Sequence, residues 1–197
     1  MPDSSGELAG RTALITGAGS GIGREASLLM SAAGATVVVC DIDTTGGEET
    51  VAQITAAGGQ AAFVRADVSS AKDVEAAIDV ARSHGGLHIL FNNAGIFPAA
   101  DGSPPDTGED VWEQVINVNL KGVFLGFKYG IPAMLAAAGG SIITTASFVR
   151  VVGAAISHIP YSPSKSRSRA LTLHLPLCLL AQHIRAIPMP TGLSVWP

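Results

Sequence analysis

The sequence has little cysteine, few charged residues and no long apolar run. Only two of its 197 residues are cysteines, Cys40 and Cys178, so no disulfide framework is expected. Charged residues make up 14% of the chain and apolar residues 47%, which excludes a disordered segment. The longest strongly apolar stretch, 171–181, is too short to span a bilayer and contains His174 and Pro176. We therefore expect no transmembrane helix.

The amino-terminal region also lacks the marks of a secretory signal. Residues 1–10 are acidic and polar, with neither a basic segment nor an apolar one. The length of 197 residues is enough for one domain with a substantial core. We expect a single domain over 1–197 and a cytoplasmic location without membrane contact.

Neither a metal ion nor a nucleic acid is indicated as a partner. The chain has no acidic residue after Glu113, so the first 113 residues carry all 16 acids and five of the twelve Lys and Arg. The remaining seven cations are spread over the rest of the chain instead of forming a basic patch, so we expect no nucleic-acid binding. The five histidines share no metal-ligand spacing with one another or with either cysteine.

Short apolar runs alternate with helical segments along most of the chain. Such a pattern predicts βαβ units with right-handed crossovers, and therefore an α/β protein with a parallel sheet. We predict strands over 12–15, 36–40, 63–64, 87–91 and 141–145. We predict helices over 22–33, 48–57, 72–83, 110–137 and 161–182, with helices on both faces of the sheet in three layers.

A glycine-rich loop joins the first predicted strand to the first predicted helix. Glycines there allow a tight turn and let backbone N–H groups approach a pyrophosphate at the positive end of the helix. The alternative is a turn that is merely tight, whereas a nucleophile elbow is excluded because Ala18 and Ile22 stand where it needs glycines. The residues expected at a dinucleotide are Gly17, Gly19, Ser20, Gly21, Ile22 and Gly23.

An acid follows the second predicted strand at the position that favours NAD. Asp41 can accept hydrogen bonds from both hydroxyls of an adenosine ribose, and its charge would repel the 2′-phosphate of NADP. No Lys or Arg in the loop before Gly21 would compensate. We expect Asp41 and its neighbour Ile42 to contact NAD; the alternative is that Asp41 only caps the loop through Asp43.

Further motifs appear in order along the chain, and together they resemble one family. The motifs are the 17–23 glycine loop, Asp67-Val68 after strand three, Asn92-Asn93-Ala94-Gly95 after strand four, Asn119, Ser147 after strand five, and Tyr161-x-x-x-Lys165. From about Leu8 to Gly192 the sequence resembles a classical short-chain dehydrogenase/reductase. The resemblance implies a Rossmann-type doubly wound parallel sheet.

The resemblance also assigns the adenosine half of the cofactor. It implies that Asp67 and Val68 contact adenine, and that Asn93, Ala94 and Gly95 line the floor under the adenosine ribose. The alternative for Asp67 is that it caps the following helix. Asn92 is expected to brace the sheet and not to touch a ligand.

A catalytic set follows from the same resemblance and from acid–base chemistry. Hydride transfer at a carbonyl needs a proton partner, and a phenol with a pKa near 10 needs help at neutral pH. Lys165, four residues after Tyr161, lies on the same helix face and would favour the phenolate and bind the nicotinamide ribose. Tyr161 is thus the expected general acid/base. Ser147 would hold the substrate oxygen, and Asn119, preferred to Asn117, would hold a water that relays protons.

These assignments predict an NAD-dependent oxidoreductase that interconverts a secondary alcohol and a ketone. The alternative is a non-catalytic NAD(H)-binding protein or an inactive, shortened member of the family. The long helix 110–137 and the helix 161–182 are expected to build a homodimer or homotetramer. Residues lining the substrate pocket are expected from the 98–107 loop and the 148–159 segment.

The carboxyl-terminal part departs from the family pattern. Pro163 at the first helical position would leave Tyr161 outside the helix, and Pro176 would interrupt that helix. Pro188 and Pro190 are unfavourable inside a central parallel strand after 184–185. Relative to the family, we expect the last strand and the substrate-covering lid to be missing and activity to be impaired.

Overall fold

The computed structural model describes residues 6–147, 159–175 and 179–191. Within these ranges the strands form one parallel sheet of six strands in the order β3-β2-β1-β4-β5-β6. The order reverses between β1 and β4, which creates the crevice where such sheets bind ligands. The strands are β1 (Thr12–Thr16), β2 (Thr36–Asp41), β3 (Gln60–Arg65), β4 (Ile89–Asn92), β5 (Gly140–Ser147) and β6 (Ile184–Thr191).

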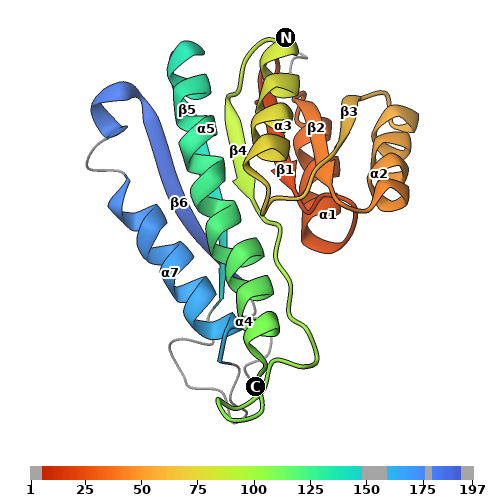
Figure 1. The fold of residues 1–197 in the computed structure, drawn as a ribbon. Coiled ribbons are helices and arrows are strands. Elements are labelled where there is room, and N and C mark those ends of the chain that lie inside the picture. The colour runs from red at the N-terminus through yellow and green to blue at the C-terminus, as the bar shows by residue number, and fades with distance from the viewer. Residues whose placement is uncertain (1–5, 148–158, 176–178, 192–197) are drawn as a thin grey trace, which may run out of the picture.

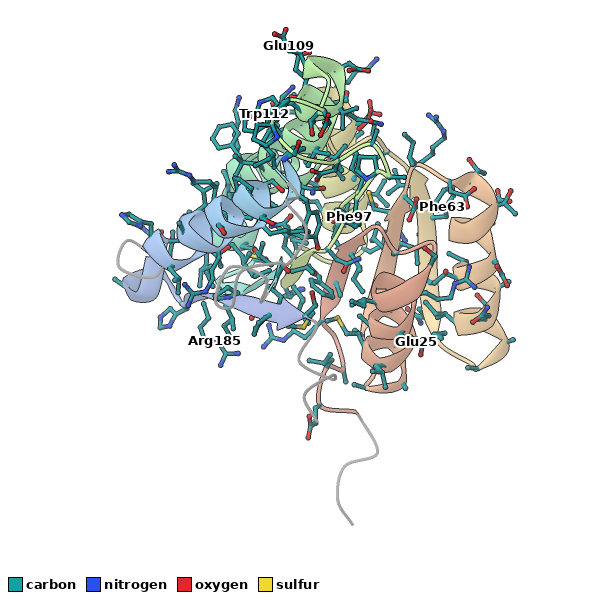
Figure 2. All side chains as sticks on the ribbon, turned by 90° about the horizontal axis from the view of Figure 1, so that it is seen from below. Glu25, Phe63, Phe97, Glu109, Trp112 and Arg185 are labelled. Atoms are coloured by element: carbon teal, nitrogen blue, oxygen red, sulfur yellow. The ribbon has the colours of Figure 1, made fainter. Side chains whose placement is uncertain are left out.

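Helices cover both faces of this sheet, as expected. Figure 1 shows α3, α5 and α7 side by side against one face. In Figure 2, Glu25 of α1 and Trp112 of α4 lie on opposite sides of the strands. No described helix is long and apolar enough to cross a bilayer. The helices are α1 (Gly21–Ala32), α2 (Thr44–Ala56), α3 (Ala71–Ser83), α4 (Glu109–Ile116), α5 (Gly122–Ala136) and α7 (Tyr161–His174), with a π-helical segment η1 (Asn117–Lys121) and a 3₁₀ turn η2 (Leu180–Gln182).

The central strands are buried on both faces, which explains their unbroken apolar runs. Successive residues alternate between two cores because a strand has a period of two. Leu14 packs with the residues of α3 and α5, while the adjacent Ile15 packs with those of α1 and α2. These two cores establish the three-layer architecture.

Helix α2 begins four residues before its predicted start at residue 48. Asp43 caps it, because its carboxylate accepts hydrogen bonds from the N–H groups of Thr45 and Gly46 at 3.1 and 3.2 Å. A methyl group on Gly47 would overlap the ring of Phe63 on β3, so glycine permits the close packing of helix and strand. Tertiary packing thus overrides the low helix propensity of the two glycines.

The predicted helix 110–137 is divided into α4, η1 and α5. The π-helical turn of η1 carries Asn119, which is fully buried. Such bulges occur frequently at functional sites and redirect the side chains that they carry. Pro132 lies inside α5 without ending it.

Pro163 does not exclude Tyr161 from the helix. Helix α7 begins at Tyr161, and Pro163 is its third residue. The first four N–H groups of a helix have no partner within it, so a proline in this turn loses no helical hydrogen bond. Pro176, within the predicted 161–182 helix, and Cys178 lie outside the described residues.

The segment with Pro188 and Pro190 forms a strand, which corrects the expectation that the prolines would oppose one. All eight residues of β6 pair in parallel register with β5. In the described sheet β6 is an edge strand, where proline is tolerated if its nitrogen faces outward. The two prolines are two residues apart and therefore direct their nitrogens to the same side.

Candidate active site

A cavity of about 770 Å³ lies where the strands end, and it collects most of the predicted site residues. Figure 2, which views the molecule from below Figure 1, looks onto this edge of the sheet. The cavity is of the size that binds small ligands and cofactors. The predicted residues that line it are Gly17, Ser20, Gly21, Ile22, Asp41, Ile42, Asp67, Val68, Asn93, Ala94, Gly95, Tyr161 and Lys165.

Four predicted residues do not line this cavity: Gly19, Gly23, Asn119 and Ser147. The two glycines belong to the glycine loop without lining the cavity, and Asn119 is fully buried. Ser147 is half-buried at the end of β5, directly before segment 148–158, which lies outside the described residues.

The glycine loop requires glycine at its turn and at its contact with the helix. Gly17 has a φ of +64°, and a methyl group there would come within 2.8 Å of the Ala94 Cα. A methyl group on Gly23 would overlap the Gly17 carbonyl oxygen. The chain can therefore turn from β1 into α1, whose amino terminus points toward the cavity.

The Asp41 carboxylate is fixed by the backbone on both sides. Its Oδ2 accepts a hydrogen bond from the Gly19 N–H at 2.7 Å, and its Oδ1 accepts one from the Asp43 N–H at 2.9 Å. A carboxylate oxygen can accept more than one bond, so Asp41 retains acceptor capacity at the cavity. The negative charge is thereby held at a defined position beside the glycine loop.

Arg24 links the glycine loop to α2, and its guanidinium is engaged by hydrogen bonds to both. Its guanidinium donates to the Gly19 carbonyl, to the Thr50 hydroxyl at 3.1 Å and to Glu49 Oε2 at 2.8 Å. Gly19 is thus held at its N–H by Asp41 and at its carbonyl by Arg24. Because these groups engage Arg24, the cation is not aimed at the cavity beside Asp41.

Asn93 joins three strands at the base of the cavity. Its Nδ2 donates to the carbonyls of Thr16 and Gly17 at 3.0 and 3.2 Å, and its Oδ1 accepts from the Thr145 hydroxyl at 3.0 Å. The side chain that braces the strand ends is therefore that of Asn93. Asn92, expected to be the brace, is buried with its Nδ2 unpaired among the described residues.

Asp67 shapes a turn at the edge of the cavity. Its Oδ1 accepts from the N–H and the hydroxyl of Ser69 at 2.8 and 2.7 Å. Ser70, and not Asp67, caps α3, because its hydroxyl accepts from the Asp73 N–H. The alternative interpretation of Asp67 as the cap of that helix is therefore wrong.

Asn119 links the segment after β4 to α7. Its Oδ1 accepts from the Ile96 N–H at 2.8 Å, and its Nδ2 donates to the Ile96 carbonyl at 3.0 Å and to the Ser164 hydroxyl at 3.2 Å. Its carbonyl accepts from the Ser168 hydroxyl at 2.8 Å. Asn117, to which Asn119 was preferred as the catalytic asparagine, lines the cavity.

Lys165 is buried at the centre of the site, with 6% of its surface exposed. Burial lowers the pKa of its ammonium from 10.5 to about 8, because the charged form loses solvation. No hydrogen bond to Lys165 is formed by the described side chains or backbone. The ammonium is therefore available to a ligand in the cavity.

Tyr161 is held by the loop that follows β4, at both its backbone and its ring. Asp101 Oδ2 accepts from the Tyr161 N–H at 3.0 Å. Phe97, labelled in Figure 2, contacts the tyrosine ring with centroids 4.8 Å apart and planes inclined by 59°. Tyr161 and Lys165 both reach the cavity from the first turns of α7.

Several residues of the cavity were not predicted. Thr145 and Thr191 follow the pattern of polar residues at strand ends, and Gln114, Asn117 and Val118 share one helical face, so both groups carried a usable signal. Phe97 gave no such signal, and Asp101, from the 98–107 loop that was expected to supply pocket residues, does not itself line the cavity. Among the described residues no cluster of His, Cys, Asp or Glu is arranged to hold a metal ion.

The sequence of this chain is similar to those of known dehydrogenases. A family model described as short chain dehydrogenase matches residues 11–193. Cyclohexanol dehydrogenase of Acinetobacter sp. (strain SE19) is 43% identical over 150 residues, covering 76% of this chain and 59% of that protein. The 3-alpha-(or 20-beta)-hydroxysteroid dehydrogenase of Mycobacterium tuberculosis is 36% identical over 194 residues, covering 98% and 72%.

Solved structures agree with the observed fold. A putative short-chain dehydrogenase/reductase from Burkholderia xenovorans superposes with a TM-score of 0.89 at 28% identity, covering 94% of this chain and 75% of that one. A 7α-hydroxysteroid dehydrogenase in complex with NADH and 7-oxo glycochenodeoxycholic acid gives a TM-score of 0.85 at 32% identity, covering 95% and 73%.

Proposed function

Because this chain belongs to the short-chain dehydrogenase family, we propose that it is an oxidoreductase that interconverts a secondary alcohol and a ketone with NAD(H). One observation carries the proposal: Tyr161 and Lys165 reach the cavity that the glycine loop and Asp41 also line. A single cavity thus combines a proton donor, a cation and a nucleotide cradle. The names of relatives, cyclohexanol and hydroxysteroid dehydrogenases, support a carbinol substrate.

The residues that line the cavity would suit the successive parts of a nicotinamide dinucleotide. The amino terminus of α1 would receive the pyrophosphate, and Asp41 the adenosine ribose hydroxyls. Asp67 and Val68 would flank adenine, while Asn93, Ala94 and Gly95 would form the floor. The carboxylate of Asp41, with Arg24 turned away to Glu49, supports a preference for NAD over NADP.

The chemistry divides between the cofactor and the side chains. When bound, the nicotinamide ring supplies or accepts the hydride. Tyr161 would give its hydroxyl proton to the substrate oxygen in reduction and take it back in oxidation. The Lys165 ammonium would stabilise the phenolate and bind the nicotinamide ribose, and Ser147 would hold the substrate oxygen.

The role of Asn119 as holder of a relay water stays a prediction. The Ser168 hydroxyl lies 2.8 Å from the Asn119 carbonyl and 2.9 Å from the Ser164 carbonyl. One hydroxyl hydrogen can serve only one of these acceptors at a time. When Ser168 donates to Ser164, the Asn119 carbonyl loses this donor and could accept a hydrogen bond from a water molecule instead.

The expected homodimer or homotetramer is likewise a proposal. Apolar side chains are exposed on both long helices of one face: Phe124 and Leu135 on α5, and Leu171 and Leu173 on α7. Figure 1 shows these helices next to each other. Light scattering of the purified chain measures the assembly directly.

Two measurements test the function. Nicotinamide fluorescence during titration with NADH and with NADPH is expected to show saturable binding that prefers NADH. Oxidation of cyclohexanol with NAD is expected in the wild type and lost in Tyr161→Phe, whereas Tyr129→Phe, the matched variant of the other tyrosine, retains it. NADH binding without any turnover would support the non-catalytic alternative.

A further inference from the structure

The catalytic helix α7 has two possible starting points in its sequence. Proline is favoured at the first helical position, so a helix that begins at Pro163 would leave Tyr161 outside it. In the structure the helix begins two residues earlier, at Tyr161. Only this start places Tyr161 and Lys165 four residues apart on one helical face.

The residue before this start does not cap it. Pro160 occupies the cap position and has no side chain that can accept a hydrogen bond. The N–H groups of the first turn have no partner within the helix and need one from outside. The Tyr161 N–H therefore needs an acceptor from another part of the chain.

Asp101 supplies that partner from the loop after β4. Its carboxylate is buried, with 4% of the residue exposed, and its Oδ2 accepts from the Tyr161 N–H at 3.0 Å. A carboxylate at the amino terminus of a helix is also favoured by the helix dipole. The Ile159 N–H donates to the Gly102 carbonyl at 3.3 Å, so the same loop also holds the residues before the helix.

We propose that Asp101 is a positioning residue that selects the helix start at Tyr161 and so sets the catalytic tyrosine against Lys165. The assignment rests on the proposed function for its catalytic consequence, but the choice of helix start is independent of activity. Phe97, on the same loop, contacts the ring of Tyr161 and complements the backbone contact. Tyr161 is thereby held at two points by one loop.

Amide hydrogen exchange reports the helix start directly. The Ser164 N–H donates to the Pro160 carbonyl at 3.1 Å, a bond that exists only if the helix includes Tyr161. In Asp101→Ala, exchange at Tyr161 and Ser164 is expected to be faster by about tenfold, the effect of losing a helix cap. Asp101→Asn, which keeps an acceptor oxygen, is expected to retain most of the protection.

A second substitution separates helix selection from general destabilisation. Adding Pro163→Ala to Asp101→Ala removes the proline that favours a helix beginning at residue 163. The Ser164 N–H should therefore regain its protection from exchange. The matched control is Asp106→Ala, because Asp106 is an exposed acid of the same loop that bonds only to Ser103 in the described structure. It is expected to exchange like the wild type at the start of α7.

Activity supplies the catalytic readout. In Asp101→Ala, kcat for alcohol oxidation should fall by about tenfold in parallel with the loss of the cap, with the NADH affinity unchanged. Unchanged exchange at Ser164, faster exchange throughout the chain, or no recovery with Pro163→Ala would each overturn the proposal. If the wild type shows no turnover, the proposed function fails, and exchange at Ser164 still decides the role of Asp101.

Discussion

The ammonium of Lys165 lies directly against Gly95: a methyl group on Gly95 would stand 2.7 Å from Nζ. The same methyl would lie 3.2 Å from Asn119 Oδ1. Gly95 thus provides the space that Lys165 occupies beside the cavity. The residue implied as part of the cofactor floor therefore also determines where the cation sits.

Replacing Gly95 by alanine should damage catalysis more than folding. The atom displaced is the end of a flexible side chain, which can move at little energetic cost, but its position matters for chemistry. A misplaced catalytic group reduces rates by up to about a hundredfold. In steady-state assays Gly95→Ala should lose between about tenfold and a hundredfold in kcat, with a melting temperature near that of the wild type.

Gly102→Ala is the matched control, because a methyl group there would meet no atom closer than 3.9 Å. It is expected to retain wild-type kcat. Equal losses in both variants would show that the effect of Gly95→Ala does not come from Lys165.

The lowered pKa of Lys165 predicts a pH-dependent stability. Burial lowers the pKa from 10.5 in solvent to about 8 in the fold. Between these values the unfolded chain binds more protons than the native one, so the free energy of unfolding rises as the pH increases from about 8 to 10.5. Below about pH 8 Lys165 is charged in both states, and the whole cost of burying its charge lowers the free energy of unfolding, by an amount on the order of 3 kcal/mol.

Urea unfolding of the wild type and Lys165→Met at about pH 7 and about pH 9.5 measures this contribution. At the lower pH, Lys165→Met should be more stable than the wild type. Its free energy of unfolding should also lack the increase with pH that comes from the titration of Lys165. Parallel pH profiles for the two proteins would contradict the burial of a charged Lys165.

Asp41→Asn should weaken discrimination between the two nicotinamide cofactors. The amide cannot accept bonds at both of its ends, and it no longer repels a 2′-phosphate. The affinity for NADH should fall by about tenfold, the value of a hydrogen bond to a charged group, while that for NADPH should not fall. Fluorescence titration with both nucleotides measures the ratio.

Asp43→Asn serves as the control for this substitution, since Asp43 caps α2 and does not line the cavity. It is expected to preserve the ratio of NADH to NADPH affinity. An equal loss of both affinities in Asp41→Asn would show that Asp41 only shapes the glycine loop.

The features that sequence could predict are those encoded locally. The glycine loop, the acid after β2 and the buried runs of β1 and β2 depend on neighbouring residues, and the structure places them as expected. The predicted start of α2 at residue 48 was four residues late, because the packing of Gly47 against Phe63, a distant contact, lets the helix include two residues of low helix propensity.

The features that sequence could not predict depend on distant contacts. Nothing local signals the π-helical turn that carries Asn119, or that β6 lies where two prolines can face outward. Asp101 is 60 residues from Tyr161, so its burial in a loop of surface-like composition is visible only in the fold. The start of α7 followed this contact and not the local preference of Pro163.

Transfer of deuterium from a labelled alcohol shows whether this chain catalyses hydride transfer to NAD. Cyclohexanol carrying deuterium on its carbinol carbon is incubated with NAD and the purified chain, and the NADH formed is examined by mass spectrometry. We expect deuterated NADH with the wild type and none with Tyr161→Phe, although that variant should still bind NADH. Saturable NADH binding by the wild type, with no deuterium transferred from any secondary alcohol in a panel, would contradict the proposed function.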